Sequence, residues 1–232
     1  VGYVMRKLGL VGLCFGVILL LTGCGNKKLD IDSDLIHDLY ASVNPTEDGL
    51  ILSDLYQNGG LSNNYMLVVA LSDYIRDQDT NVEVISKDEV DQRIESIFGD
   101  KEVEHQRTYL FLEGYCGFNY NDDLEQYEFI HGCGGDMYQS FVREIVGARE
   151  EGDNIIITEK SLYVYRDWDA DYSHVTIYNN VTQREEIDEF DNDPAVELDI
   201  NLDDYIDHAS TYEYTFERVD DHYIFKGVKL VD

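Results

Sequence analysis

The chain contains few basic residues, few prolines and few cysteines, and it has no long apolar run. Its 232 residues include 17 lysines and arginines against 48 aspartates and glutamates, which gives a formal net charge of -31. Binding to nucleic acid requires a basic surface, so this composition argues against nucleic acid as a partner. Because there are only two prolines and no low-complexity linker, we expect one domain, and a hydrophobic content of 44% is enough to build its core.

The longest apolar segment, residues 8–21, has 14 residues. A membrane-spanning helix needs about 20 and the core of a signal peptide about 7–15, so the length favours a signal peptide. Arg6 and Lys7 precede the segment, and Leu21-Thr22-Gly23-Cys24 ends it. Residues 21–24 resemble the lipobox of bacterial lipoproteins. The resemblance implies cleavage before Cys24 and a diacylglyceryl group on its thiol. The alternative is an uncleaved anchor or a chance apolar helix.

This resemblance implies a signal peptide at 1–23 and a lipidated tether at 24–33. The remaining residues, 34–232, are expected to form a single acidic α+β domain. Two acyl chains anchor a protein stably, so the lipid bilayer is an expected partner through Cys24. The implied location is the extracytoplasmic face of a bacterial plasma membrane. Cleavage removes two basic residues and no acidic one, which leaves 15 basic and 48 acidic residues and a net charge of -33. At about 3.3 Å per residue, the tether after Cys24 reaches roughly 30 Å.

Apolar residues at helical spacing predict helices in the first hundred residues. One follows Asp32-Ser33 over residues 35–40, and another follows Ser62-Asn63 over residues 67–75. Residues 50–56 form a further short apolar segment. The clearest helix is expected at 87–98, because Ser86 and Glu89 form a capping box before it and Gly99 supplies a stop after it.

From residue 107 onward, aromatic and β-branched residues alternate between acidic, Asn or Gly turns, which predicts antiparallel strands. We expect them at 107–116, 126–131, 154–166, 172–179 and 181–187, with a hairpin over 212–228. Residues 138–149 fit a helix or a strand, and the turn-like residues 150–153 favour the strand. Asn201 is expected to cap a short helix.

Helices followed by an antiparallel meander predict an α+β fold, in which amino-terminal helices cover one face of a curved, mainly antiparallel sheet. The cone-shaped sheet of the nuclear-transport-factor-2-like folds is one form that such a sheet takes. That comparison depends on element order alone and implies no function.

Two cysteines remain besides Cys14 in the signal segment and Cys24. Outside the cytoplasm, Cys116 and Cys133 are expected to form a disulfide, with two free buried thiols as the alternative. A further hypothesis makes one of them a catalytic nucleophile with His105 or His131 as its base.

Asp167, Asp169 and Asp171 alternate as the first ligands of a calcium loop do, which makes them weak candidates for Ca²⁺. The EF-hand pattern then fails, because Tyr172 stands at the glycine position and Tyr178 at that of the bidentate glutamate. An acidic hairpin tip is the favoured interpretation, so no cofactor is expected. The acidic runs at 30–34 and 188–193 are predicted to be solvated loops.

No complete catalytic or zinc-binding motif of the His-Glu-x-x-His, paired Cys-x-x-Cys or Gly-x-Ser-x-Gly type is present. We therefore expect a non-enzymatic lipoprotein with a binding or scaffolding domain. In general pattern the mature part resembles uncharacterised acidic lipoproteins of low-GC Gram-positive bacteria. Two alternatives stay open, a small extracytoplasmic hydrolase and a divalent-cation-binding module. The aromatic residues of 212–225 belong either to a ligand pocket or, as is more usual, to the core, and the charge favours cationic or uncharged partners.

Overall fold

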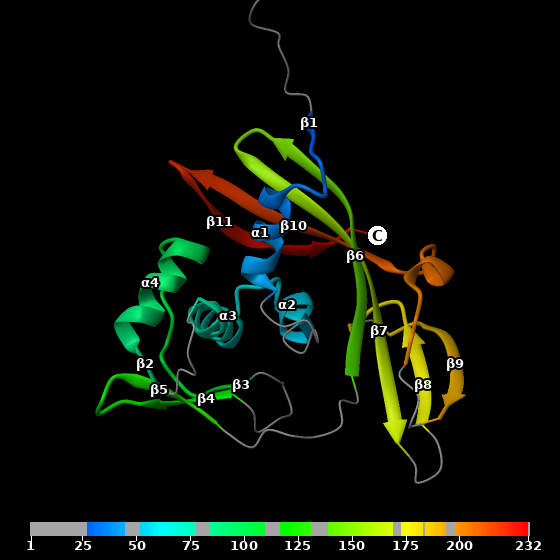
Figure 1. The fold of residues 1–232 in the computed structure, drawn as a ribbon, viewed down its shortest axis with the longest axis horizontal. Helices are drawn as coiled ribbons and strands as arrows, with labels where there is room; N and C mark the ends of the chain where they lie inside the picture. Colours follow the sequence, from blue (N-terminus) through cyan, green and yellow to red (C-terminus); the bar gives the residue numbers. More distant parts are fainter. Residues whose placement is uncertain are drawn as a thin grey trace, which may run out of the picture.

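The computed structural model contains helices and two antiparallel sheets (Figure 1). It describes residues 27–44, 52–77, 84–109, 117–130, 139–168, 173–182, 184–193 and 198–231. The α-helices lie between residues 34 and 98, and most strands follow them. The predicted α+β class is therefore confirmed.

The helices occur where apolar spacing and caps predicted them. They are α1 (Asp34–Val43), α2 (Leu52–Asn58), α3 (Asn63–Arg76) and α4 (Lys87–Phe98). The Ser62 hydroxyl accepts a hydrogen bond from the third residue of α3. At α4 the predicted capping box is complete, because the Glu89 N–H donates to Ser86 Oγ over 3.3 Å and the Ser86 N–H donates to Glu89 Oε2 over 2.9 Å. Gly99, with a φ of 72°, ends that helix.

The larger sheet is organised around one long strand. Its order is β1 (Lys27–Lys28), β6 (Gln139–Glu151), β7 (Asn154–Trp168), β10 (Ser210–Val219) and β11 (His222–Leu230), with β8 (Ser173–Tyr178) and β9 (Glu186–Asn192) joined to β7. Residues 154–161 of β7 pair with β10, and residues 163–168 pair with β8. Two pairs of strands therefore share one edge of β7, with β10 and β11 along its first half and β8 and β9 along its second half. The sheet divides into two branches at this strand (Figure 1).

A smaller sheet lies beside α3 and α4. Its order is β2 (Val84–Ser86), β5 (Gln126–Phe129), β4 (Gly117–Asn121) and β3 (Thr108–Tyr109), all antiparallel. Ser86 is both the last residue of β2 and the N-cap of α4. No linker separates the strand from the helix, so the position of the small sheet determines where α4 begins.

Helices α1 to α3 lie on one face of the larger sheet, and the main core fills the space between them. The aromatic hairpin supplies that face with Tyr212, Tyr214, Phe216 and Phe225, each at most 2% exposed. The ring of Tyr212 stacks on Tyr56 of α2 with centroids 4.0 Å apart. Core packing of this aromatic face is confirmed. A second, smaller cluster lies around Leu162 on the opposite face, under the 3-10 turn η2 (Leu202–Tyr205).

One predicted strand is displaced. The sequence predicted a strand at 181–187, but Asn179 Oδ1 instead accepts from the N–H groups of Asn180 (2.8 Å) and Glu185 (3.0 Å). The strand β9 starts at Glu186 and takes in most of the acidic run 188–193, which was predicted to be a loop. Among the described strands, β9 pairs only with β8. Such an edge position tolerates charged side chains, since one side of the strand faces water.

Other elements differ in extent. Residues 139–149 are strand, as favoured, and Asn201 caps a single 3-10 turn that is shorter than the predicted helix. The sequence did not predict β1, β2 or β4. In β1, Lys27 and Lys28 pair with Glu150 and Arg149 of β6, so part of the predicted tether 24–33 belongs to the sheet. The partners of β1 and β2 are distant in sequence, so residue type alone gave no sign of these two strands, whereas β4 forms a hairpin with the predicted strand β5.

Candidate functional site

A glutamate carboxylate lies buried in the middle of the fold. Glu159 belongs to β7 and is 0% exposed. Three tyrosine hydroxyl groups donate to it, from Tyr40 in α1, Tyr56 in α2 and Tyr214 in β10, the last over 3.1 Å. Two helices and a neighbouring strand therefore meet at one side chain.

The strand register explains why this polar residue points inward. Side chains alternate along a strand, and Glu159 is in phase with Ile155 and Ile157, which face the core. Across the sheet it stands opposite Ile145 of β6 and Tyr212 of β10. The sequence analysis missed this residue. Its phase with two isoleucines is the signal that could have revealed it.

An arginine lies next to the glutamate on the same face of the sheet. Arg143 of β6 donates from Nη1 to the Tyr40 hydroxyl and to Asn44 Oδ1, each over 3.0 Å. Its guanidinium also lies over the Tyr40 ring, 5.6 Å from the centroid. The Tyr40 hydroxyl therefore accepts from a cation and donates to the carboxylate of Glu159. We call Glu159, Arg143 and the three tyrosines the buried cluster.

Burial raises the pKa of Glu159, because water is absent where the charge would form. Arg143 and the tyrosine hydroxyls oppose that effect, but the net direction is upward. Burial and the nearby carboxylate raise the pKa of Tyr40, Tyr56 and Tyr214 above the ordinary range of tyrosine. The three tyrosines consequently keep their protons at physiological pH and act as hydrogen-bond donors.

The buried cluster contains the kinds of titratable group that an acid-base catalytic site uses, but a substrate has no access to them. Glu159 is fully buried, and its two oxygens already accept three hydrogen bonds, so a substrate cannot reach it in this structure. A buried polar network whose members are satisfied holds its elements in one arrangement. The geometry therefore supports a structural role, in which the cluster holds α1 and α2 against the sheet.

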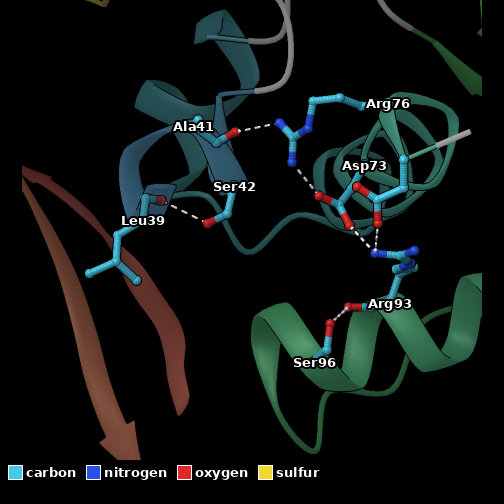
Figure 2. Close-up of polar contacts among 8 residues, drawn as sticks. Leu39, Ala41, Ser42, Asp73, Arg76, Arg93 and Ser96 are labelled. Carbon is cyan, nitrogen blue, oxygen red and sulfur yellow. Dashed lines mark hydrogen bonds and ion pairs between the residues drawn. The ribbon is translucent and has the colours of Figure 1, made fainter. Parts of the chain in front are cut away.

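A second buried carboxylate joins the helices to one another, as Figure 2 shows. Asp73 of α3 is 8% exposed and forms ion pairs with Arg76 and, over 2.8 Å, with Arg93 of α4. Arg76 also donates to the carbonyl oxygen of Ala41 in α1 over 3.1 Å. One aspartate thus links α1, α3 and α4, which again is a structural arrangement.

The histidine considered as a base is already occupied. His105 Nδ1 lies 2.9 Å from the Tyr127 hydroxyl, and Nε2 lies 2.9 Å from Asp91 Oδ1. Both ring nitrogens therefore already have hydrogen-bonding partners. The lipid-site candidate Cys24, the candidate disulfide Cys116 and Cys133, and the other histidine considered, His131, lie outside the described residues.

The calcium candidates are only partly described. Asp167 lies in β7 opposite His174 of β8, whose Nδ1 is 3.0 Å from Asp191 Oδ1. The hydrogen bond to Asp191 raises the pKa of His174. The strands β7 and β8 come together on either side of 169–172, and Asp169 and Asp171 lie outside the described residues.

Within the described residues, His, Cys, Asp and Glu side chains form no group of three or more that could hold a metal ion. A surface groove of about 280 Å³ is lined by Lys28, Gly147, Ala148, Arg149 and Thr158. A separate search for membrane spans found no helix of sufficient length and apolarity to cross a membrane in the part of the chain that the structure describes.

No family model, curated protein or solved structure matches this chain.

Proposed function

We propose that this protein is a lipid-anchored extracytoplasmic lipoprotein whose single domain binds or scaffolds another molecule and is not an enzyme. The lipobox resemblance at residues 21–24 supports the anchor. The buried cluster supports the second part, because its titratable groups serve to hold helices to a sheet and are closed to a substrate.

One structural observation carries the proposal. The chain enters the sheet at Lys27, only three residues after Cys24, because β1 pairs with β6 and the Leu29 N–H donates to the Ala148 carbonyl over 2.9 Å. Three residues span at most about 10 Å. An acylated Cys24 would therefore hold the domain directly against the membrane, at the end of the sheet where β6 turns into β7.

This orientation directs the other end of the molecule outward. In Figure 1 the β6–β7 turn and β1 lie at one end, and β8, β9 and the smaller sheet lie toward the other. The outward end includes the acidic edge strand β9, Glu186–Asn192. With a mature net charge of -33, cationic or uncharged partners fit this surface best.

A substitution at Cys24 tests the anchor. Cys24→Ala should abolish incorporation of a labelled fatty acid, leave the precursor unprocessed by the lipoprotein peptidase and remove the lipid-dependent part of membrane binding. Cys14→Ala is the matched control, because it removes a cysteine from the signal core and leaves the acylated residue in place. Fatty-acid labelling of Cys24→Ala equal to that of the parent would overturn the proposal.

We also propose that the larger sheet is a cone of the nuclear-transport-factor-2-like kind. The long strands β6 and β7, the branching at β7 and the helices on one face support this comparison. It carries no function. An experimental structure whose sheet encloses the helices on a concave face would agree with it, and a flat sheet would contradict it.

A further inference from the structure

The groove beside β1 has the chemistry of an anion site. Its lining residues Lys28, Gly147, Ala148, Arg149 and Thr158 come from the first strand, from β6 and from β7. We call it the anchor-side groove. Gly147 has no side chain, and a Cβ built on it would meet only Thr158, at an ordinary 3.6 Å. Its position therefore leaves space between the two cationic residues and the sheet.

Two like charges face each other across this groove. Lys28 and Arg149 are directly opposite in the antiparallel pairing of β1 and β6, so their side chains leave the same face of the sheet. Like charges in that position are destabilising unless something compensates them. Among the described residues Lys28 makes no ion pair, whereas the exposed neighbour Lys27 lies 3.7 Å from Glu150.

The carboxylates nearby do not fully compensate these cations. Arg149 pairs with Glu213 over 2.7 Å and, more loosely, with Glu151 over 3.6 Å. Glu213 is shared, because Lys229 also pairs with it, over 3.0 Å. Arg149 and Lys229 therefore share the Glu213 carboxylate, whereas Lys28 has no ion-pair partner among the described residues.

The short chain between Cys24 and β1 indicates which anion would reach the anchor-side groove. If Cys24 is acylated, its lipid lies within about 10 Å of Lys27, and the nearest anions are the phosphates of membrane phospholipids. Arg and Lys bind phosphate through charge-assisted hydrogen bonds. We propose that the anchor-side groove binds the phosphate of a phospholipid headgroup through Lys28 and Arg149, and so orients the domain on the membrane. This rests on the proposed function.

The total charge of the chain does not oppose this contact. Charges separated by more than about 8 Å are largely screened at physiological ionic strength, so Lys28, Arg149 and the charged groups next to them govern contacts in the groove. Zwitterionic lipids carry the same phosphate, so the site does not require an anionic membrane.

Amide hydrogen exchange of the acylated full chain tests the proposal. Exchange at residues 27–29 and 147–149 is compared in phospholipid nanodiscs, in maltoside micelles that contain no phosphate, and in those micelles with inorganic phosphate. Exchange should slow about tenfold or more in nanodiscs relative to micelles, the size expected for hydrogen bonds to a charged group. Lys28→Gln should lose this protection, and Gly147→Val should lose it by filling the groove without a change of charge. Lys87→Gln, in α4 near the opposite end, is the matched control and should keep it.

The mass of the peptide that contains Cys24 reports acylation independently, so a failed anchor is distinguished from an empty groove. With acylation confirmed, equal exchange in nanodiscs and micelles would overturn the proposal. Protection by inorganic phosphate with none in nanodiscs would overturn it too, because the ligand would then be free phosphate. Full protection retained in Lys28→Gln would show that the groove does not recognise the headgroup.

Discussion

Glu159 shows how a single buried polar residue determines the arrangement of several elements. Placing a carboxylate in the core is costly, and three tyrosine donors and Arg143 offset that cost only where all of them are in position. An apolar residue would pack against many arrangements of α1 and α2. The carboxylate favours one, since every other arrangement leaves buried groups without partners.

Two substitutions at Glu159 should separate hydrogen bonding from charge. Glu159→Leu should lower the free energy of unfolding by about 3–5 kcal/mol, because it leaves three buried hydroxyls without their acceptor and removes the negative charge near Arg143. Glu159→Gln keeps an acceptor oxygen and should cost much less. Urea unfolding at neutral pH measures both, and equal losses in the two variants would contradict the role of the hydroxyl donors.

The raised pKa of Glu159 also predicts a pH dependence. A carboxyl group whose pKa is raised on folding contributes stability that is fully present below its unfolded pKa and is lost as the pH rises through the folded value. Relative to Glu159→Gln, the parent should therefore lose stability as the pH rises above the ordinary glutamate range. Urea unfolding of both proteins across that range is the measurement, and an opposite slope would show that Arg143 outweighs burial.

At the scale of elements, local caps and turns determine where helices and strands begin. The Ser86–Glu89 box fixes the start of α4 through contacts within four residues, so the sequence predicted its bounds. The turn after β8 is also local, but Asn179 reaches six residues along the chain to Glu185 and postpones β9. The alternation of residue types predicted a strand there, because it contains no information about a hydrogen bond from Glu185 to Asn179.

Removing the cap of α4 should have a measurable cost. Ser86→Ala should lower the free energy of unfolding by about 1 kcal/mol, within a usual range of roughly 0.5–2, because the Glu89 N–H loses its acceptor. Ser96→Ala is the matched control on the same helix. Its hydroxyl only donates to the Arg93 carbonyl at an exposed site, and alanine is the better helix former, so stability should stay level or rise slightly. Thermal and urea unfolding measure both, and equal losses would contradict the capping role.

For the whole molecule, the dominant property is the net charge of -31. Net charge far from zero keeps a protein soluble but destabilises the compact state through self-repulsion. Ion pairs such as Arg149–Glu213 and Lys226–Glu217 neutralise only some of the carboxylates on the sheet. Repulsion among the remaining carboxylates therefore opposes folding, and screening by salt should raise the free energy of unfolding.

Salt should raise the thermal stability of the fold. An increase of NaCl from about 0.01 M to about 0.1 M shortens the Debye length from roughly 30 Å to roughly 10 Å and so weakens the repulsion among carboxylates. We expect Tm to increase by about 2–4 °C, the shift that about 1 kcal/mol produces in a domain of this size. Differential scanning calorimetry measures it. Calcium chloride at matched ionic strength is the comparison, and a larger increase there would favour the divalent-cation-binding alternative. An unchanged Tm in NaCl would contradict self-repulsion.

The sequence by itself determined the helices, the aromatic hairpin and the α+β class, because caps and apolar spacing are local patterns. The anchor at Cys24 stays a prediction from the lipobox resemblance. Only the tertiary structure decided that Glu159 points inward, that Lys28 stands opposite Arg149 and that β9 is an edge strand. The first two depend on the pairing of segments far apart in the chain, and the third depends on which strands leave one side of β9 without a partner among the described strands. Register across a sheet is set by the partner strand, and residue type along one strand does not specify that partner.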